Sequence, residues 1–144
     1  MDAILTLQNQ LHFTAVADSG FTVHMDTKAP AGEASQGASP MELLMIGLAG
    51  CTAMDVVSIL RKKRQNLTGF EIRIHGDRAA EHPKVFTDFE LEYIVRGVDI
   101  DPSAVERAIL LSVENYCSVH AMLEKAAHIR TRFTIIQEQE AYTG

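Results

Sequence analysis

The sequence predicts an α+β fold with antiparallel sheets, and three observations support that prediction. Apolar and polar residues alternate with a period of two over residues 1–26, again within 68–96, and once more over 129–137. A capping box opens a long apolar helix at 39–64, and a second helical region covers 101–127. Because this order contains no internal repeat and no interdomain linker, we expect a single domain over residues 1–144.

The composition narrows the class of protein. The 144 residues are 47% hydrophobic and 22% charged, as in an ordinary globular domain. A net charge of -6 argues against a general nucleic-acid binder, which needs a surplus of Lys and Arg on one face. The basic run Arg61–Arg64 is a local exception, and its place at the end of the predicted helix fits a turn that complements the helix dipole.

Two further features bear on localisation. The segment Met1–Gln10 has an acidic second residue and alternates like a strand, which does not match a signal peptide. The longest uncharged apolar run, Leu43–Met54, has 12 residues, fewer than the roughly 18 to 20 that cross a bilayer. We therefore expect a cytoplasmic protein in a reducing compartment, without a membrane partner.

The first 38 residues read as strands followed by a loop. Alternation over Leu11–Ala17 and Phe21–Asp26 predicts two strands after the strand-like start of the chain, with turns at Asn9-Gln10 and Asp18–Gly20. Small and polar residues over 27–38 predict the loop.

The central helix has a clear start and an unusual surface. Ser39 occupies the N-cap position, Pro40 the first helical position and Glu42 the third, which is the capping box. From Leu43 to Leu60 apolar residues lie on nearly every face, so the helix must be covered all round. A sheet from one chain of this size covers one side, and we expect a homodimer to cover the other.

The second half repeats the two periodicities. Alternation over Phe70–Ile74 and Phe89–Val95 predicts two antiparallel strands joined through Asp77–Pro83. Asp101-Pro102 then begins the second helical region, and alternation over Ile129–Ile135 predicts the last strand.

Two cysteines, Cys51 and Cys117, are the only ones in the chain, and both fall in strongly apolar helical stretches. A chain this rich in apolar residues needs no disulfide staple, so the thiols have either a chemical role or the inert role of buried apolar Cys. Cys117 lies where the second helical region could break and restart, and a helix N-terminus favours a thiolate. A disulfide between the two requires their Cα atoms to come within about 7 Å.

Metal and cofactor chemistry find little support. Cys117 and His120 have helical i, i+3 spacing, but no second ligand pair follows at zinc-like spacing, so we expect no metal. His120 is read as a surface histidine, with a base beside Cys117 as the other reading. No GxSxG, Walker or GxGxxG motif occurs, and we expect no cofactor.

The stretch Ser39–Val57, with Cys51 at its thirteenth position, and the stretch Tyr116–Val119 resemble the OsmC/Ohr family of thiol peroxidases, in its OsmC-like branch. The resemblance covers essentially the whole chain. It implies an OsmC-like fold, in which two antiparallel sheets wrap two long central helices of an intertwined homodimer with active sites at the subunit interface.

The resemblance also implies a chemistry. Cys51 would be the peroxidatic cysteine, whose thiolate attacks an organic hydroperoxide to give an alcohol and a sulfenic acid. Cys117 would be the resolving cysteine, forming a disulfide that an external dithiol of lipoyl type reduces. The function expected on this basis is organic hydroperoxide reduction in oxidative stress defence.

The chain departs from the family pattern at one point. Studied members carry a Glu ten residues before the first cysteine, paired with an N-terminal Arg, whereas here that position is Met41 and the carboxylate is Glu42. Glu42 is therefore a weak site candidate that is better explained as a helix cap. No Arg precedes Arg61, so Lys28, His24 or an Arg of the second subunit would have to replace the missing cation.

This departure keeps other readings open. One is a non-catalytic OsmC-like dimer that binds a small apolar ligand or acts as a thiol redox sensor. Another is a structural domain with inert core thiols.

Overall fold

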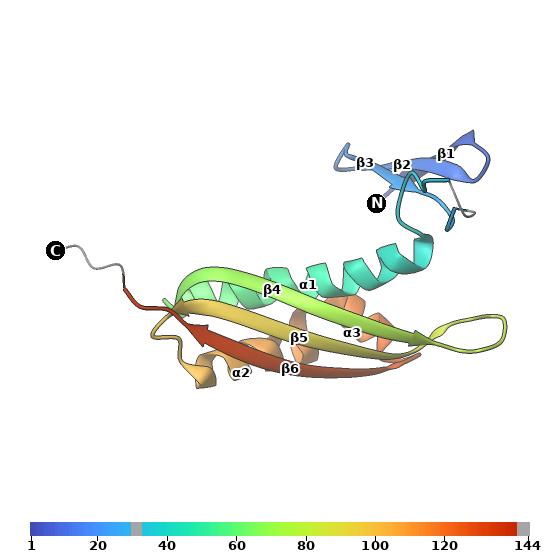
Figure 1. The fold of residues 1–144 in the computed structure, drawn as a ribbon. Coiled ribbons are helices and arrows are strands. Elements are labelled where there is room, and N and C mark those ends of the chain that lie inside the picture. Colours follow the sequence, from blue (N-terminus) through green and yellow to red (C-terminus); the bar gives the residue numbers. More distant parts are fainter. Residues whose placement is uncertain (30–32, 141–144) are drawn as a thin grey trace. The chain divides into compact units, whose positions relative to one another are not determined.

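The computed structural model describes residues 1–29 and 33–140, and Figure 1 shows its elements. The chain divides into two compact units, 1–46 and 47–144, which are described one at a time. That all 144 residues form one domain stays a prediction. In chain order the elements are β1 (Ala3–Asn9), β2 (His12–Ala17), β3 (Thr22–Met25), α1 (Pro40–Lys62), β4 (Asn66–Arg78), β5 (Phe86–Val98), α2 (Pro102–Leu111), the π-helical turn η1 (Ser112–Tyr116), α3 (Ser118–Leu123) and β6 (His128–Gln137).

The N-terminal unit is built on an antiparallel sheet in the order β1-β2-β3. The register pairs Leu7 with Phe13 and Phe13 with Met25, so apolar residues of all three strands share one face. The opposite face carries Thr14 paired with His24. On the apolar face Leu5 and Leu7 are still more than half exposed, so this unit leaves apolar surface uncovered.

The predicted capping box is confirmed at the start of α1. The Ser39 amide donates to Glu42 Oε1 at 3.1 Å, and the Glu42 amide donates to Ser39 Oγ at 3.2 Å. The hydrogen bond from the Ser39 backbone, followed by that with its side chain, lowers the pKa of Glu42. Glu42 thus has a complete structural explanation within its own helix turn.

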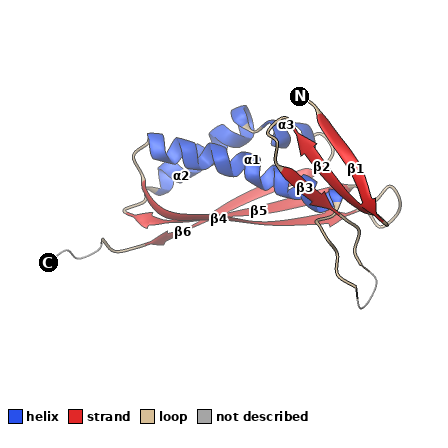
Figure 2. Ribbon diagram, turned by 90° about the horizontal axis from the view of Figure 1, so that it is seen from above, coloured by secondary structure: helices blue, strands red, loops and turns tan. Residues whose placement is uncertain are grey.

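The C-terminal unit places helices on one face of the sheet β4-β5-β6 (Figure 2). β4 and β5 are antiparallel, as predicted, but β6 runs parallel to β5. The expectation of purely antiparallel sheets is therefore wrong for this pair. The physical reason is the connection, since the helical segment between β5 and β6 is long enough to return the chain to the same end of the sheet.

The core of this unit lies between the sheet and the helices. The central strand β5 alternates buried residues toward the helices. On α1 the buried positions recur every fourth residue, which gives one stripe facing the sheet. The fully buried side chains of the core include Leu48, Thr52, Val56, Leu60, Phe89, Leu91, Tyr93, Val95 and Val105.

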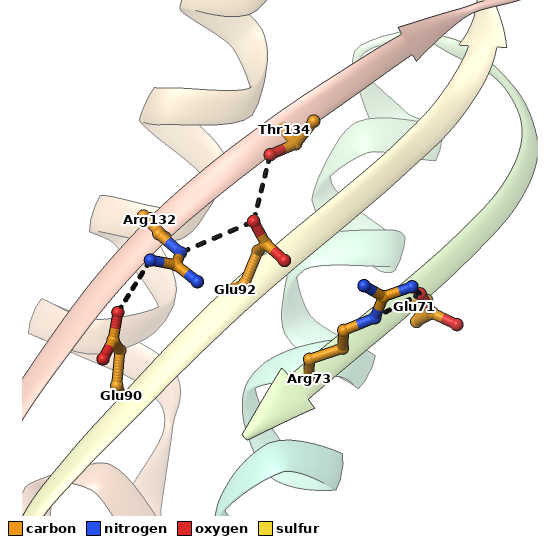
Figure 3. A network of polar contacts seen from close by, with 6 residues as sticks. All are labelled: Glu71, Arg73, Glu90, Glu92, Arg132 and Thr134. Atoms are coloured by element: carbon orange, nitrogen blue, oxygen red, sulfur yellow. Dashed lines mark hydrogen bonds and ion pairs between the residues drawn. The ribbon is translucent and has the colours of Figure 1, made fainter. Parts of the chain in front are cut away.

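The other face of the sheet carries a ladder of charges (Figure 3). Arg132 on β6 reaches Glu90 at 2.9 Å and Glu92 at 3.4 Å on β5, and Thr134 donates to Glu92 at 3.2 Å. On β4, Arg73 pairs with Glu71 at 3.1 Å. Pairs of this kind near the surface contribute about 0.2–1 kcal/mol each, so the contacts of Arg132 and Thr134 favour the β5-β6 register more than they stabilise the fold.

The outward side of α1 in the C-terminal unit is open. A Cβ built on Gly47 or Gly50 would meet nothing within 4 Å in the described part of the chain, and Met54 is 76% exposed. By length and composition α1 is also long and apolar enough to cross a bilayer. The uncharged run in the sequence is shorter because it ends at Asp55, but a membrane span tolerates one such charge. Core helices of soluble proteins meet the same criterion when they are mostly buried; here 22% of the apolar window is buried, along the stripe of α1 that packs on the sheet.

Candidate thiol site

The C-terminal unit brings the two cysteines close together. Cys51 lies midway along α1 and Cys117 immediately precedes α3, and the two thiols are close enough for Cys51 to raise the pKa of Cys117. Both sulfurs are free. Cys51 is half-buried, whereas Cys117 is 2% exposed. The convergence that sequence spacing left undecided is thus present, with one accessible and one buried sulfur.

The backbone around Cys117 breaks as the sequence predicts. The π-helical turn Ser112–Tyr116 ends when Cys117 adopts an extended conformation, with ψ at 100°. The Cys117 amide donates to the Ser112 carbonyl at 2.7 Å, and the His120 amide donates to Cys117 Sγ at 3.4 Å. The sulfur therefore caps α3 by accepting one backbone hydrogen bond, while the amide of the same residue is held by the Ser112 carbonyl.

The protonation of Cys117 differs from the expectation. The pKa of the Cys117 thiol is raised to about 12, chiefly by burial and next by the nearby Cys51 thiol, while the hydrogen bond from the His120 amide lowers it by less. The idea that the helix N-terminus would favour a Cys117 thiolate is wrong, because loss of solvation outweighs one amide hydrogen bond. At neutral pH Cys117 is therefore a thiol.

A series of hydrogen-bonded, buried hydroxyl groups lies beside the thiols, and the sequence did not predict it. Thr52 Oγ1 is 2.8 Å from both Tyr93 OH and Ser112 Oγ, and Ser112 Oγ donates to Asp55 Oδ2 at 2.9 Å. Burial raises the pKa of Tyr93 to about 12, so its hydroxyl stays protonated. The available signal was the presence of Thr52 and Asp55 on an otherwise apolar helix next to Cys51. Their partners lie 41 to 60 positions away, where no periodicity reaches.

His120 is buried, which corrects its interpretation as a surface residue. Its Nδ1 lies 3.5 Å from a Glu124 carboxylate oxygen but forms no hydrogen bond with a described residue. The contact between His120 and Cys117 is the hydrogen bond that the His120 backbone amide donates to Cys117 Sγ. The alternative role as a base for Cys117 stays a prediction.

The cation candidates lie in the N-terminal unit. His24 Nδ1 is 2.9 Å from His12 Nε2 in a stacked pair, and Lys28 is exposed. Glu42 also belongs to that unit, where it caps α1. In residues 1–29 and 33–140 no group of three His, Cys, Asp or Glu side chains is arranged to hold a metal ion.

The raised pKa values of Cys117 and Tyr93 predict a loss of stability in alkali. Each group keeps its proton more tightly in the folded chain, so its contribution is complete below its unfolded pKa and is lost as pH rises toward 12. We expect the free energy of unfolding, measured with urea, to fall by on the order of 2–4 kcal/mol between pH 8 and pH 11. Tyr93→Phe should show a smaller fall, and an equal fall in this variant would contradict the assignment to Tyr93.

Comparisons with known proteins find one matching family model and several proteins that are similar in sequence or in structure. The family model described as OsmC-like protein matches residues 32–132. Protein YhfA of Escherichia coli K12 is 40% identical over 126 residues, which cover 88% of this chain and 91% of YhfA. A hypothetical protein from Aquifex aeolicus VF5 has a solved structure with a TM-score of 0.85 at 29% identity, covering 96% of this chain and 97% of that one. The organic hydroperoxide resistance protein OhrB of Bacillus subtilis has the same fold, with a TM-score of 0.63 at 16% identity over 93% of this chain and 98% of OhrB.

Proposed function

This chain belongs to the family of OsmC-like proteins, and from that premise we propose that it is a thiol-dependent peroxidase that reduces organic hydroperoxides through Cys51 and Cys117. The observation that supports the proposal most is the proximity of two free thiols contributed by segments 66 positions apart. The name of OhrB, a protein of the same fold, points to the same substrate class.

The two sulfurs have unequal environments that suit unequal roles. Cys51 is accessible enough to meet a peroxide, and its thiolate attacks the terminal oxygen. The O–O bond breaks, the alkoxide leaves as an alcohol after protonation, and Cys51 becomes a sulfenic acid. Buried Cys117 then attacks the Cys51 sulfur, and the S–O bond breaks with release of water.

The cycle closes with an external dithiol, which attacks the Cys51–Cys117 disulfide and is itself oxidised. A lipoyl-type dithiol is the reductant that we propose. Gly47, Gly50 and Met54 on the open face of α1 lie within about one helix turn of Cys51 along the chain, and such an apolar surface favours carbon-bearing peroxides over hydrogen peroxide, because their organic part gains by leaving water.

We also propose that the working unit is a homodimer. The open face of α1 with Gly47, Gly50 and Met54 lies in one unit, and the exposed apolar face of β1 lies in the other. Apolar surface of this extent is unfavourable for an isolated monomer, and a second copy supplies complementary surface.

A peroxide-consumption assay coupled to mass spectrometry tests the peroxidase proposal. With cumene hydroperoxide and dihydrolipoamide we expect sustained turnover. With cumene hydroperoxide alone we expect one intramolecular Cys51–Cys117 disulfide per chain. Absence of the disulfide, or turnover no faster than that of the dithiol alone, would contradict the proposal.

A redox sensor is the second candidate, and Asp55 favours it. This carboxylate lies one helix turn after Cys51 and forms no ion pair with a described residue, so it opposes negative charge nearby. A sensor would form the disulfide with peroxide but would not be recycled rapidly by small dithiols. Single-turnover oxidation without steady-state consumption would therefore select this candidate.

A further inference from the structure

Ser112 connects the two cysteine-bearing segments. It is fully buried at the start of the turn Ser112–Tyr116. Its hydroxyl lies 2.8 Å from Thr52 Oγ1 and 2.9 Å from Asp55 Oδ2, both on α1, and its carbonyl accepts the Cys117 amide at 2.7 Å. One residue thus contacts the α1 turn that carries Cys51 and the backbone that carries Cys117.

The hydrogen bonds of this hydroxyl have a fixed direction. A hydroxyl has one proton, and Ser112 gives its proton to Asp55, so it must accept from Thr52. Thr52 has then used its proton, and it accepts in turn from Tyr93. This series of hydrogen bonds runs from the Tyr93 hydroxyl to the Asp55 carboxylate, and each bond polarises the next.

The placement of these contacts makes them relevant to the thiols. Thr52 follows Cys51 directly, and Asp55 lies one turn later, so both partners of Ser112 belong to the Cys51 turn. Cys117 sits between a π-helical turn and the short helix α3, where few regular hydrogen bonds fix the backbone. The Ser112 contacts therefore supply local restraint where the helix ladder is interrupted.

We propose that Ser112 is a positioning residue that holds Cys117 against Cys51 and thereby sets the rate at which the disulfide closes. This inference rests on the proposed function for its physiological setting. In the closing step the Cys117 sulfur bonds to the Cys51 sulfur of the sulfenic acid, the S–O bond breaks, and the Cys117 proton leaves with the hydroxyl as water. Since a displacement of about 1 Å costs about a hundredfold in such a step, loosening Ser112 slows it strongly.

The experiment compares disulfide closure in the full chain and its variants by rapid quench and mass spectrometry. Cumene hydroperoxide is one oxidant. Diamide is the other, because it couples two adjacent thiols to a disulfide while it is reduced to the hydrazine, without any peroxidase activity. Ser112→Ala should slow closure ten- to a hundredfold with either oxidant. Formation of the Cys51 sulfenic acid with cumene hydroperoxide should change less than about twofold.

Two further variants separate positioning from general loss of stability. Asp55→Asn retains an oxygen that accepts from Ser112 and should close at nearly the wild-type rate, whereas Asp55→Leu removes the acceptor and should slow closure as Ser112→Ala does. Tyr93→Phe is the matched control, since it removes one buried hydroxyl from the same series of hydrogen bonds, and Tyr93 itself is bonded to Thr52 rather than to Ser112. It should lower stability but leave closure unchanged.

The outcomes distinguish the two proposals. If the wild-type chain forms the disulfide with diamide but not with cumene hydroperoxide, the peroxidase proposal is refuted. The positioning role of Ser112 can then still be measured with diamide. Closure of Ser112→Ala at the wild-type rate, or equal slowing in Tyr93→Phe, would overturn the role of Ser112. A wild-type chain that forms no disulfide with either oxidant would overturn both.

Discussion

Cys51→Ser is expected to abolish peroxide consumption, whereas Cys117→Ser should stop the reaction one step later. A serine hydroxyl is far less nucleophilic than a thiolate at neutral pH, so Cys51→Ser should fall to the background rate of the dithiol. Cys117→Ser should still be oxidised once by cumene hydroperoxide. Its sulfenic acid has no second sulfur to close on, and it should accumulate as an adduct with dimedone.

This pair of variants contains its own control. Both replacements are nearly isosteric, so a comparable urea midpoint would show that lost activity is not lost folding. Rapid dimedone labelling of Cys117→Ser together with none in Cys51→Ser is the expected pattern. Labelling of Cys117 in the Cys51→Ser variant would reverse the assigned roles.

The order of reactivity follows from the surroundings of the two sulfurs. Burial and the nearby Cys51 thiol hold Cys117 in its thiol form, with a pKa of about 12. A protonated and enclosed thiol is a poor first nucleophile for a peroxide. Once the nearby Cys51 carries an electrophilic sulfur, proximity compensates for this weak acidity, because the attack is intramolecular.

The sequence predicts the parts of this structure that depend on neighbouring residues. The start of α1 follows from Ser39, Pro40 and Glu42, whose interactions span three positions. The break at Cys117 follows likewise from a local change in helical pattern. Resemblance to a family adds the fold itself, since the chain matches OsmC-like proteins over most of its length.

The features that the sequence did not predict depend on distant pairing. The parallel direction of β6 is decided by the helical crossover before it, and alternation within a strand carries no direction. The bonds of Ser112 to Thr52 and Asp55 join residues more than fifty positions apart. Periodicity identifies a buried face, but it does not show which polar groups meet inside the core.

The two sides of α1 should respond differently to truncation. The side chain of Leu60 is fully buried in the core of the C-terminal unit, whereas Met54 is 76% exposed on the open face. Leu60→Ala should lower the free energy of unfolding by about 2–5 kcal/mol, through lost transfer energy and the cavity that remains. Met54→Ala should cost the fold of the single chain little, because its side chain makes few contacts there.

Protein concentration then separates folding from dimerisation. If a second copy covers the open face, Met54→Asp should shift the chain from dimer to monomer in light scattering, because an unpaired carboxylate would be buried at the interface. Leu60→Ala should instead lower the unfolding midpoint with little change in the dissociation constant. A Met54→Asp variant that stays dimeric at micromolar concentration would place the interface elsewhere, and the apolar side of α1 would then need another cover.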